Sequence, residues 1–167
     1  MSTKATIRTG ESAPSLSLPD VEGQTHSLTQ ALAKGPVLLA FFKVGCPTCQ
    51  YAFPFIERLH RQFAGHGAAF WGISQDDQAA SRDFASEYGL SFPILIDRKP
   101  YQTSDDYGVG YTPTLFLVAP DGKVKLTGDG FSKQDLIQTQ KWLSHSLSVA
   151  PGDLFLPGER VPEFKPG

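Results

Sequence analysis

The sequence lacks several features that would point to other classes of protein. Its 15 basic residues are balanced by 17 acidic ones, and no run of lysine or arginine could follow a phosphate backbone. We therefore expect no nucleic-acid partner. No window approaches the roughly 18 apolar residues of a membrane span, and the first residues lack the apolar core of a signal peptide. These absences predict a cytoplasmic protein without a membrane partner.

Cysteine is nearly absent too, since the chain holds only Cys46 and Cys49. Structural disulfides are rare in a reducing cytosol, so this pair indicates redox chemistry or metal binding. Zinc needs four ligands, and there is no second cysteine pair. We therefore expect no metal and no other cofactor. The four histidines are scattered and are expected on the surface: His26, His60, His66 and His145.

What the sequence does have is one stretch, residues 37–63, that holds both cysteines at the break between two patterns. Its first six residues (VLLAFF) form a continuous apolar run, which is typical of a strand buried on both faces. After Gly45 the apolar side chains recur at helical spacing, at Phe53, Ile56, Leu59 and Phe63. The stretch therefore predicts a strand, a turn carrying the cysteines and a helix.

The rest of the chain alternates strand and helix patterns. Residues 68–74 (AAFWGIS) form a second apolar strand, and the helix before it predicts a right-handed parallel crossover. Hairpins are expected around the turns at residues 19–23 and 120–122, and a short strand at residues 92–96. Helix starts are expected at Ser27 or Thr29, at Asp76 or Asp77, and at Ser132 with Asp135. The pattern predicts an α/β protein with a mixed sheet and helices on both sides.

Composition divides the chain into two parts. Residues 1–150 hold all the predicted helices and strands, and we expect them to form one domain. Residues 151–167 contain four prolines and three glycines, so no regular element is expected there. They also contain Leu154, Phe155, Leu156, Val161 and Phe164. We therefore expect this extension to lie across the domain or a partner subunit, with a disordered tail as the alternative.

The predicted position of the cysteines suits thiol chemistry. The thiolate is the nucleophile, and the free N–H groups and positive dipole end at the first turn of a helix stabilise it. Pro47 fits this turn because it has no N–H to lose, and Thr48 leaves little bulk in front of the pair. We therefore expect Cys46 to attack a substrate disulfide and Cys49, one turn deeper, to resolve the mixed disulfide.

These motifs resemble those of thioredoxin-fold proteins, specifically the redoxin family. This family includes the alkyl hydroperoxide reductase and thiol-specific antioxidant (AhpC/TSA) proteins and the TlpA-like thiol-disulfide oxidoreductases. Residues 10–28 resemble the family's opening hairpin, GCPTC at residues 45–49 its active-site turn, and Pro54 its helix-kinking proline. Residues 107–124 resemble the loop with a cis-proline, here Pro113. From the residues alone, an ordinary trans turn fits Pro113 equally well.

The resemblance implies a three-layer thioredoxin-like fold, with residues 76–96 as the redoxin-type insertion. It implies that the loop at Pro113 packs against the cysteine pair and that the backbone of Thr112 pairs with bound substrate. Pro47, Thr48, Thr112 and Pro113 are therefore the expected substrate contacts. The implied partners are a protein or small-molecule disulfide and a thiol reductant or reductase.

The sequence also departs from the family's pattern around the pair. Gly45 stands where thioredoxin-like proteins usually carry a tryptophan, and Ala40 and Ala52 stand where relatives keep carboxylates. The usual proton acceptor for the second cysteine is missing. Lys43 is a candidate for tuning the acidity of the pair by Coulomb attraction, and a lysine solvated at the strand end is the alternative.

Two alternative functions stay open. The first is a peroxiredoxin-type thiol peroxidase, because CPT also occurs around the peroxidatic cysteine of that family. Its pattern needs a proline seven residues and a threonine or serine three residues before that cysteine, where Leu39 and Lys43 precede Cys46. The second is a redox-switched binding module, with an apolar docking patch formed by Phe42, Tyr51 and Tyr111.

Overall fold

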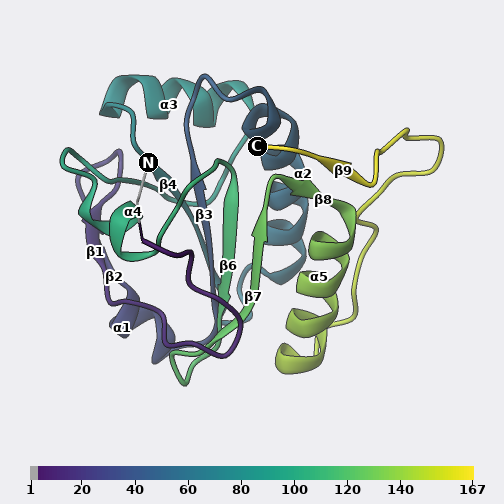
Figure 1. Cartoon of the computed structure of the whole chain (residues 1–167). Helices are drawn as coiled ribbons and strands as arrows, with labels where there is room; N and C mark the ends of the chain where they lie inside the picture. Colours follow the sequence, from purple (N-terminus) through teal and green to yellow (C-terminus); the bar gives the residue numbers. More distant parts are fainter. Residues whose placement is uncertain (1–3) are drawn as a thin grey trace.

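A mixed five-stranded sheet forms the middle layer of the protein, shown in Figure 1 as a computed structural model that describes residues 4–167. The strands are β3 (Val37–Phe42), β4 (Ala69–Ser74), β5 (Ile94–Ile96), β6 (Thr114–Val118) and β7 (Val124–Asp129). They lie in the order β5-β4-β3-β6-β7. β3, β4 and β5 are parallel, whereas β6 is antiparallel to β3 and to β7. This sheet confirms the predicted α/β class and the parallel crossover.

Five helices and two small antiparallel sheets complete the described chain. The helices are α1 (Leu28–Leu32), α2 (Pro47–Phe63), α3 (Gln78–Glu87), α4 (Gln102–Asp106) and α5 (Lys133–Leu147). The small sheets pair β1 (Ser17–Pro19) with β2 (Thr25–Ser27), and β8 (Phe131–Ser132) with β9 (Phe164–Lys165). The first of these is the predicted N-terminal hairpin. No helix within residues 4–167 has the length and apolar character that a membrane span requires.

The strand before the cysteines is buried because its side chains alternate between two cores. Every second residue from Leu38 belongs to the core that contains Phe53 of α2 and Leu136 of α5. The residues between them, from Val37, belong to a core on the other face with Leu28 of α1 and Tyr107 after α4. No side chain of β3 is more than 2% exposed. The sheet is thus covered on both faces, which gives three layers.

Local capping signals place three helix starts as predicted. Ser27, Asp77 and Ser132 are the N-caps of α1, α3 and α5, and each side-chain oxygen accepts a hydrogen bond from the backbone N–H three residues on. The short helix α4 was not predicted. Its N–H of Ser104 and the Ser104 hydroxyl both donate to the buried carboxylate of Asp97, at 2.8 and 2.7 Å. The sequence pattern does not show this cap because the carboxylate comes from outside the helix.

Two histidines depart from the expected surface position. The side chain of His26 is 21% exposed and bonds to Asp20 at 2.7 Å, and His60 is packed against aromatic rings. His60 on α2 is half-buried, with its ring centroid 5.3 Å from that of Phe70 and 5.7 Å from that of Phe92. Burial disfavours the charged imidazolium and lowers the pKa of His60 below its ordinary value. His60 therefore belongs to the packing between α2 and the sheet, and the surface prediction is wrong for both histidines.

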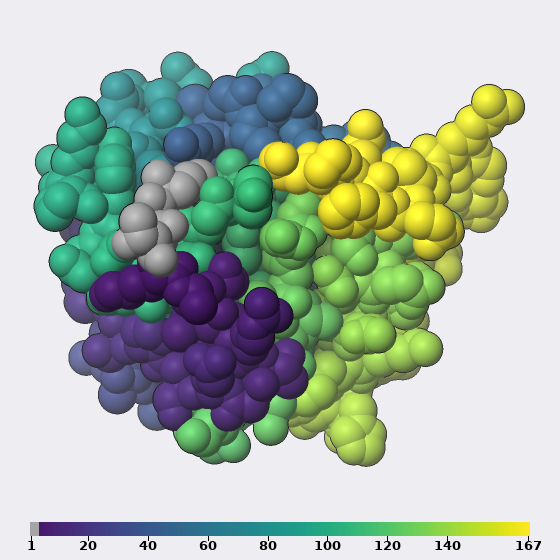
Figure 2. Space-filling model, in the orientation of Figure 1, coloured from purple at the N-terminus to yellow at the C-terminus, as the bar shows by residue number. Residues whose placement is uncertain are grey.

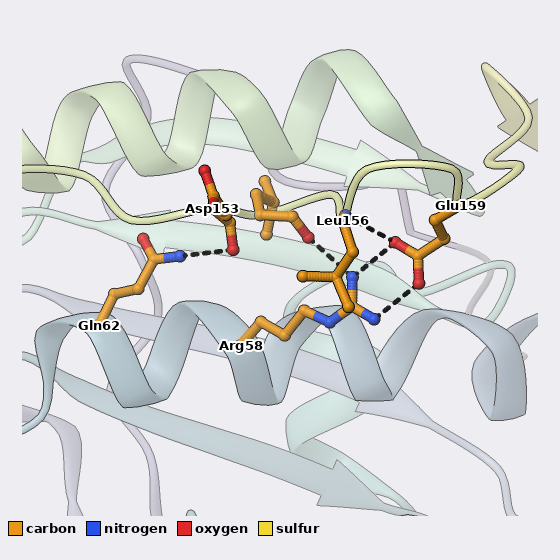
Figure 3. A network of polar contacts seen from close by, with 6 residues as sticks. Arg58, Gln62, Asp153, Leu156 and Glu159 are labelled. Atoms are coloured by element: carbon orange, nitrogen blue, oxygen red, sulfur yellow. Dashed lines mark hydrogen bonds and ion pairs between the residues drawn. The ribbon is translucent and has the colours of Figure 1, made fainter.

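The extension at residues 151–167 lies along α2 and α5 and is held there by polar side chains of both helices (Figure 1, Figure 3). Arg58 of α2 makes two hydrogen bonds of 2.7 Å to the carboxylate of Glu159 and one of 2.9 Å to the carbonyl of Leu154. Gln62 donates to the carbonyl of Asp153, and Gln140 of α5 to that of Gly152. Arg58 is therefore the centre of an anchor that ties the extension to the domain.

Apolar contacts support this anchor. Leu154 is only 4% exposed and belongs to the main core, and the ring of Phe155 lies 5.6 Å from that of Phe55. Leu156, in contrast, is 49% exposed. The extension thus crosses the domain in extended form, as its composition predicted. The prolines and glycines predicted no regular element in the extension, and the two-residue strand β9 is an exception to this prediction.

The anchor makes a prediction about stability. Leu154→Ala removes a buried side chain from a packed site and should lower the free energy of unfolding by about 2–4 kcal/mol. Leu156→Ala is the matched control, because it removes the same atoms from an exposed position and should change the free energy by less than about 0.5 kcal/mol. Urea denaturation of both variants measures the difference. Equal effects of the two substitutions would show that the extension does not contribute to the core.

Candidate active site

Cys46 lies at the turn between β3 and α2 and caps the helix with its sulfur. Its backbone is extended, and Sγ accepts a hydrogen bond of 3.1 Å from the N–H of Cys49. Helix N-caps usually use the oxygen of serine, threonine, aspartate or asparagine for this bond. Pro47 occupies the first helical position, where the missing N–H costs nothing. The sulfur is thus held where the N–H groups of α2 and its positive dipole end favour a negative charge.

The two thiols have different surroundings. Cys46 is partly exposed, whereas Cys49 is fully buried in the main core beside Ala52 and Phe53. Burial raises the pKa of the Cys49 thiol far above its ordinary value, and its hydrogen bond with the Cys46 side chain raises it further. Both cysteines are free in this structure. The pair therefore presents one accessible sulfur and one shielded, protonated sulfur.

The loop before β6 forms the other side of the site. Its Thr112–Pro113 peptide bond is cis, and the carbonyl of Thr112 accepts a hydrogen bond of 3.3 Å from Cys46 Sγ. Antiparallel pairing places Thr114 at the start of β6 opposite Phe41 near the end of β3, so the loop lies beside the cysteine turn. The structure thus brings the predicted residues Thr112 and Pro113 against the cysteine pair.

Asp76 is a site residue that the sequence analysis assigned only to helix capping. Its carboxylate accepts a hydrogen bond of 2.8 Å from the N–H of Val44, while Gln50 donates to the carbonyl of Val44 at 2.9 Å. These two bonds fix both backbone groups of Val44 in the turn before Cys46. The signal was available, because β3 and β4 are parallel and residues that follow parallel strands meet at the same edge of the sheet.

Lys43 contributes its backbone to the turn, since its carbonyl accepts a hydrogen bond of 3.2 Å from the N–H of Cys46. Its side chain borders a cavity of about 290 Å³ that is also lined by Gln75, Asp76, Pro100, Tyr101, Ser104 and Asp105. Lys43 therefore borders the same cavity as two aspartates, Asp76 and Asp105. Tuning of the cysteine pair by Lys43 stays a prediction.

The buried carboxylate of α2 is committed to another contact. Glu57 accepts hydrogen bonds from the N–H and the hydroxyl of Ser91 and from Arg61. Burial raises the pKa of Glu57, but these hydrogen bonds outweigh it and leave the pKa below its ordinary value. Glu57 also lies eight residues after Cys49, which is about 12 Å along a helix. Glu57 therefore cannot take the place of the carboxylates that relatives carry at the positions of Ala40 and Ala52.

The three aromatic residues proposed for a docking patch have different positions. Phe42 is fully buried, and Tyr51 is partly buried with its ring 5.0 Å from that of Phe131. Tyr111 is 64% exposed, next to Thr112. Of the three, Tyr111 is therefore the residue that offers an open apolar surface beside the site.

Comparison with known proteins agrees with this geometry. The model of the AhpC/TSA family matches residues 9–127. The thiol-disulfide oxidoreductase ResA of Geobacillus thermodenitrificans is 36% identical over 151 residues, which cover 89% of this chain and 82% of that protein.

Two solved structures are also similar. A chain assigned as the thiol:disulfide interchange protein DsbE of Chlorobium tepidum has a TM-score of 0.75 and 25% identity, over 85% of this chain and 99% of that chain. The peroxidoxin BcpB of Mycobacterium tuberculosis has a TM-score of 0.67 and 25% identity, over 85% and 97% of the two chains. With its thioredoxin-like sheet and its Cys-x-x-Cys turn, the chain belongs to the AhpC/TSA family and is an enzyme of the thiol-disulfide oxidoreductase type.

Proposed function

We propose that Cys46 is the attacking cysteine and Cys49 the resolving cysteine of this oxidoreductase. The observation that carries the proposal is the asymmetry of the pair. Cys46 is partly exposed and its sulfur caps α2, whereas Cys49 is fully buried. An incoming disulfide therefore meets Cys46 first, and Cys49 is reserved for the second step.

In the first step the thiolate of Cys46 attacks one sulfur of the substrate disulfide. A bond forms between Cys46 and that sulfur, the substrate disulfide breaks, and its other sulfur leaves as a thiolate that takes a proton from water. The N–H of Cys49, which donates to Cys46 Sγ at 3.1 Å, stabilises the attacking thiolate. The carbonyl of Thr112 marks the side on which Cys46 meets the cis-proline loop.

In the second step Cys49 attacks the Cys46 sulfur of the mixed disulfide. The Cys46–Cys49 disulfide forms, the bond to the substrate breaks, and the proton of Cys49 ends on the released thiol. The substrate has then gained two electrons and the enzyme has lost two. A thiol reductant or reductase must return them, so the cycle requires a second partner.

Substrate contacts are proposed at Pro47, Thr48, Thr112 and Pro113, which surround the accessible sulfur. Thr48 is partly exposed on the first turn of α2, and its hydroxyl is positioned to donate to a carbonyl in front of the pair. The substrate is a protein or small-molecule disulfide. A cytoplasmic location and an antioxidant role rest on the sequence and stay proposals.

Peroxide reduction is the second candidate, and the similarity to the peroxidoxin BcpB favours it. Peroxiredoxins orient the peroxide with a threonine or serine and an arginine, according to the resemblance described above. In the described chain the Cys46 sulfur bonds to backbone groups of Cys49 and Thr112 and to the Cys49 thiol, and to no threonine or serine hydroxyl or arginine. Disulfide exchange therefore fits the site better than peroxide reduction.

The roles of the two cysteines can be separated by substitution. Cys49→Ser should accumulate a stable mixed disulfide between Cys46 and a substrate peptide, because the resolving step is lost. Cys46→Ser should form no adduct and should reduce insulin no faster than buffer. Mass spectrometry under non-reducing conditions measures the adducts. An adduct on Cys49 in the Cys46→Ser variant would reverse the two roles.

The burial of Cys49 predicts an unusual pH dependence. The pKa of its thiol is higher in the folded than in the unfolded protein. Its contribution to stability is therefore fully present below the unfolded pKa and is lost as the pH rises toward the folded value. A free cysteine titrates at about pH 8.5. In folded Cys46→Ser, the ultraviolet absorbance of the Cys49 thiolate should not rise at that pH. The same variant in denaturant should titrate there. A folded-state midpoint equal to the denatured one would contradict the burial of Cys49.

The hydrogen bond from Val44 to Asp76 predicts a role for Asp76 in positioning the turn. Asp76→Ala removes the acceptor, so we expect about 1 kcal/mol less stability and slower insulin reduction. Asp76→Asn is the matched control, because its side-chain oxygen can still accept this bond and both properties should be retained. Urea denaturation and the insulin assay measure the two effects. Equal activity of the alanine variant and the wild type would remove Asp76 from the account.

A further inference from the structure

Residues 163–167 of the extension cross the face of the molecule that carries the cysteine turn. In Figure 2 these yellow atoms lie between the blue surface of the turn and α2 and the green surface around residues 110–130. The carbonyl of Pro166 accepts a hydrogen bond of 2.6 Å from the hydroxyl of Thr48, the residue before Cys49. Gly167 lies so close to Thr112 that an added Cβ would overlap the Thr112 carbonyl. This is the carbonyl that accepts the hydrogen bond from Cys46.

The same residues are bound as an extended strand. Lys165 pairs with Phe131 and Phe164 with Ser132, so β9 lies antiparallel beside β8. The N–H of Lys133 donates to the carbonyl of Glu163 at 3.0 Å. Gly130, with φ +70°, has no side chain, and an added Cβ would meet the carbonyl of Lys165. We call the surface formed by Thr48, Thr112, Gly130 and β8 the strand groove.

From these contacts we infer that the strand groove binds an extended polypeptide segment of the substrate, and that residues 163–167 occupy this groove in cis and compete with the substrate. The inference rests on the proposed function, since it takes Cys46 as the sulfur that the substrate must reach. The hydrogen bonds in the groove involve the main chain of the occupant, which any extended peptide can supply. Its side chains add an ion pair of 3.9 Å between Glu163 and Lys133 and a contact of the Lys165 ammonium with the Tyr51 ring, 5.1 Å from the ring centroid. Residues 163–167 therefore serve as an example of the ligand that the groove accepts, an extended peptide.

Residues 163–167 are exposed in the groove and stay tethered to the domain. Residues 162–167 are exposed, and Phe164 keeps 54% of its surface in solvent. The anchor formed by Arg58, Leu154 and Glu159 lies upstream and does not involve the groove. Gly158, with φ +79°, lies within this anchor region before the chain turns to the groove. The segment is thus a tethered ligand, whose effective concentration is set by the length of the tether.

Competition in cis has a defined kinetic consequence. A substrate that binds only the open groove has an apparent dissociation constant equal to the intrinsic one divided by the open fraction. The segment should therefore raise KM for a peptide or protein disulfide without changing kcat. Cys46 stays partly exposed while the segment is bound, so a small alkylating reagent should still reach its sulfur.

The test compares the full chain with a chain truncated after Pro162, which keeps the anchor. If the groove is open about a tenth of the time, truncation should lower KM for insulin about tenfold and leave kcat unchanged. The rate of Cys46 alkylation by iodoacetamide should change less than about twofold. Full-length Glu163→Gln is the matched control, because it removes only an exposed ion pair with Lys133 and should keep the wild-type KM.

A synthetic peptide of residues 160–167 (RVPEFKPG) supplies a second readout. It should inhibit the truncated protein competitively and bind it more tightly than it binds the full chain, whereas a peptide of the same residues in scrambled order should do neither. In the full chain, a saturating disulfide peptide should speed hydrogen exchange in residues 164–165, because it displaces them from their pairing with β8. This measurement needs no variant.

The outcomes distinguish the two claims. An unchanged KM on truncation, together with no binding of the RVPEFKPG peptide, would overturn competition in the groove. If neither form of the protein reduces insulin but the peptide still binds the truncated chain, the proposed function fails and the groove stands. If truncation speeds alkylation as much as insulin reduction, the segment shields the sulfur in general and is not a competitor for a peptide site.

Discussion

The hydrogen bond from the N–H of Cys49 to the sulfur of Cys46 is the interaction on which the rest of the site depends. Because of this bond the sulfur is the N-cap of α2, so the reactive atom lies directly at the N-terminus of the helix. The position of that cap is fixed by the buried strand β3 on one side and by the bonds of Val44 to Asp76 and Gln50 on the other. The same bond sets the order of the thiols, because it turns one sulfur outward and leaves Cys49 in the core.

The extension gives this site a feature that lies outside the thioredoxin-like domain. Its first half is anchored by a buried leucine and a bidentate arginine contact, and its second half follows the edge of β8 to the carbonyl of Thr112. Anchoring and occupancy are carried by different residues. The proposed opening of the groove can therefore leave the packing of Leu154 intact, so that peptide binding in the groove is adjustable at little cost to the fold.

The sequence predicted those parts of the structure that depend on local patterns. β3 and α2 follow from an apolar run, a break at Gly45 and helical spacing, and the caps at Ser27, Asp77 and Ser132 follow from side chains that bond three residues ahead. The cis bond at Pro113 was expected only from the family resemblance. Asp76, α4 and β9 were missed or assigned other roles because their partners lie far away in the sequence, where strand register and packing decide.

The central claim is that Cys46 attacks disulfides and Cys49 completes the exchange. Stopped-flow mixing of the reduced protein with a peptide disulfide and, separately, with hydrogen peroxide tests it most directly. The account predicts rapid oxidation by the disulfide, ending in the Cys46–Cys49 bond, and oxidation by peroxide at the rate of an ordinary free thiol. Oxidation by peroxide much faster than that of a free thiol, with slow reaction of the disulfide, would contradict it.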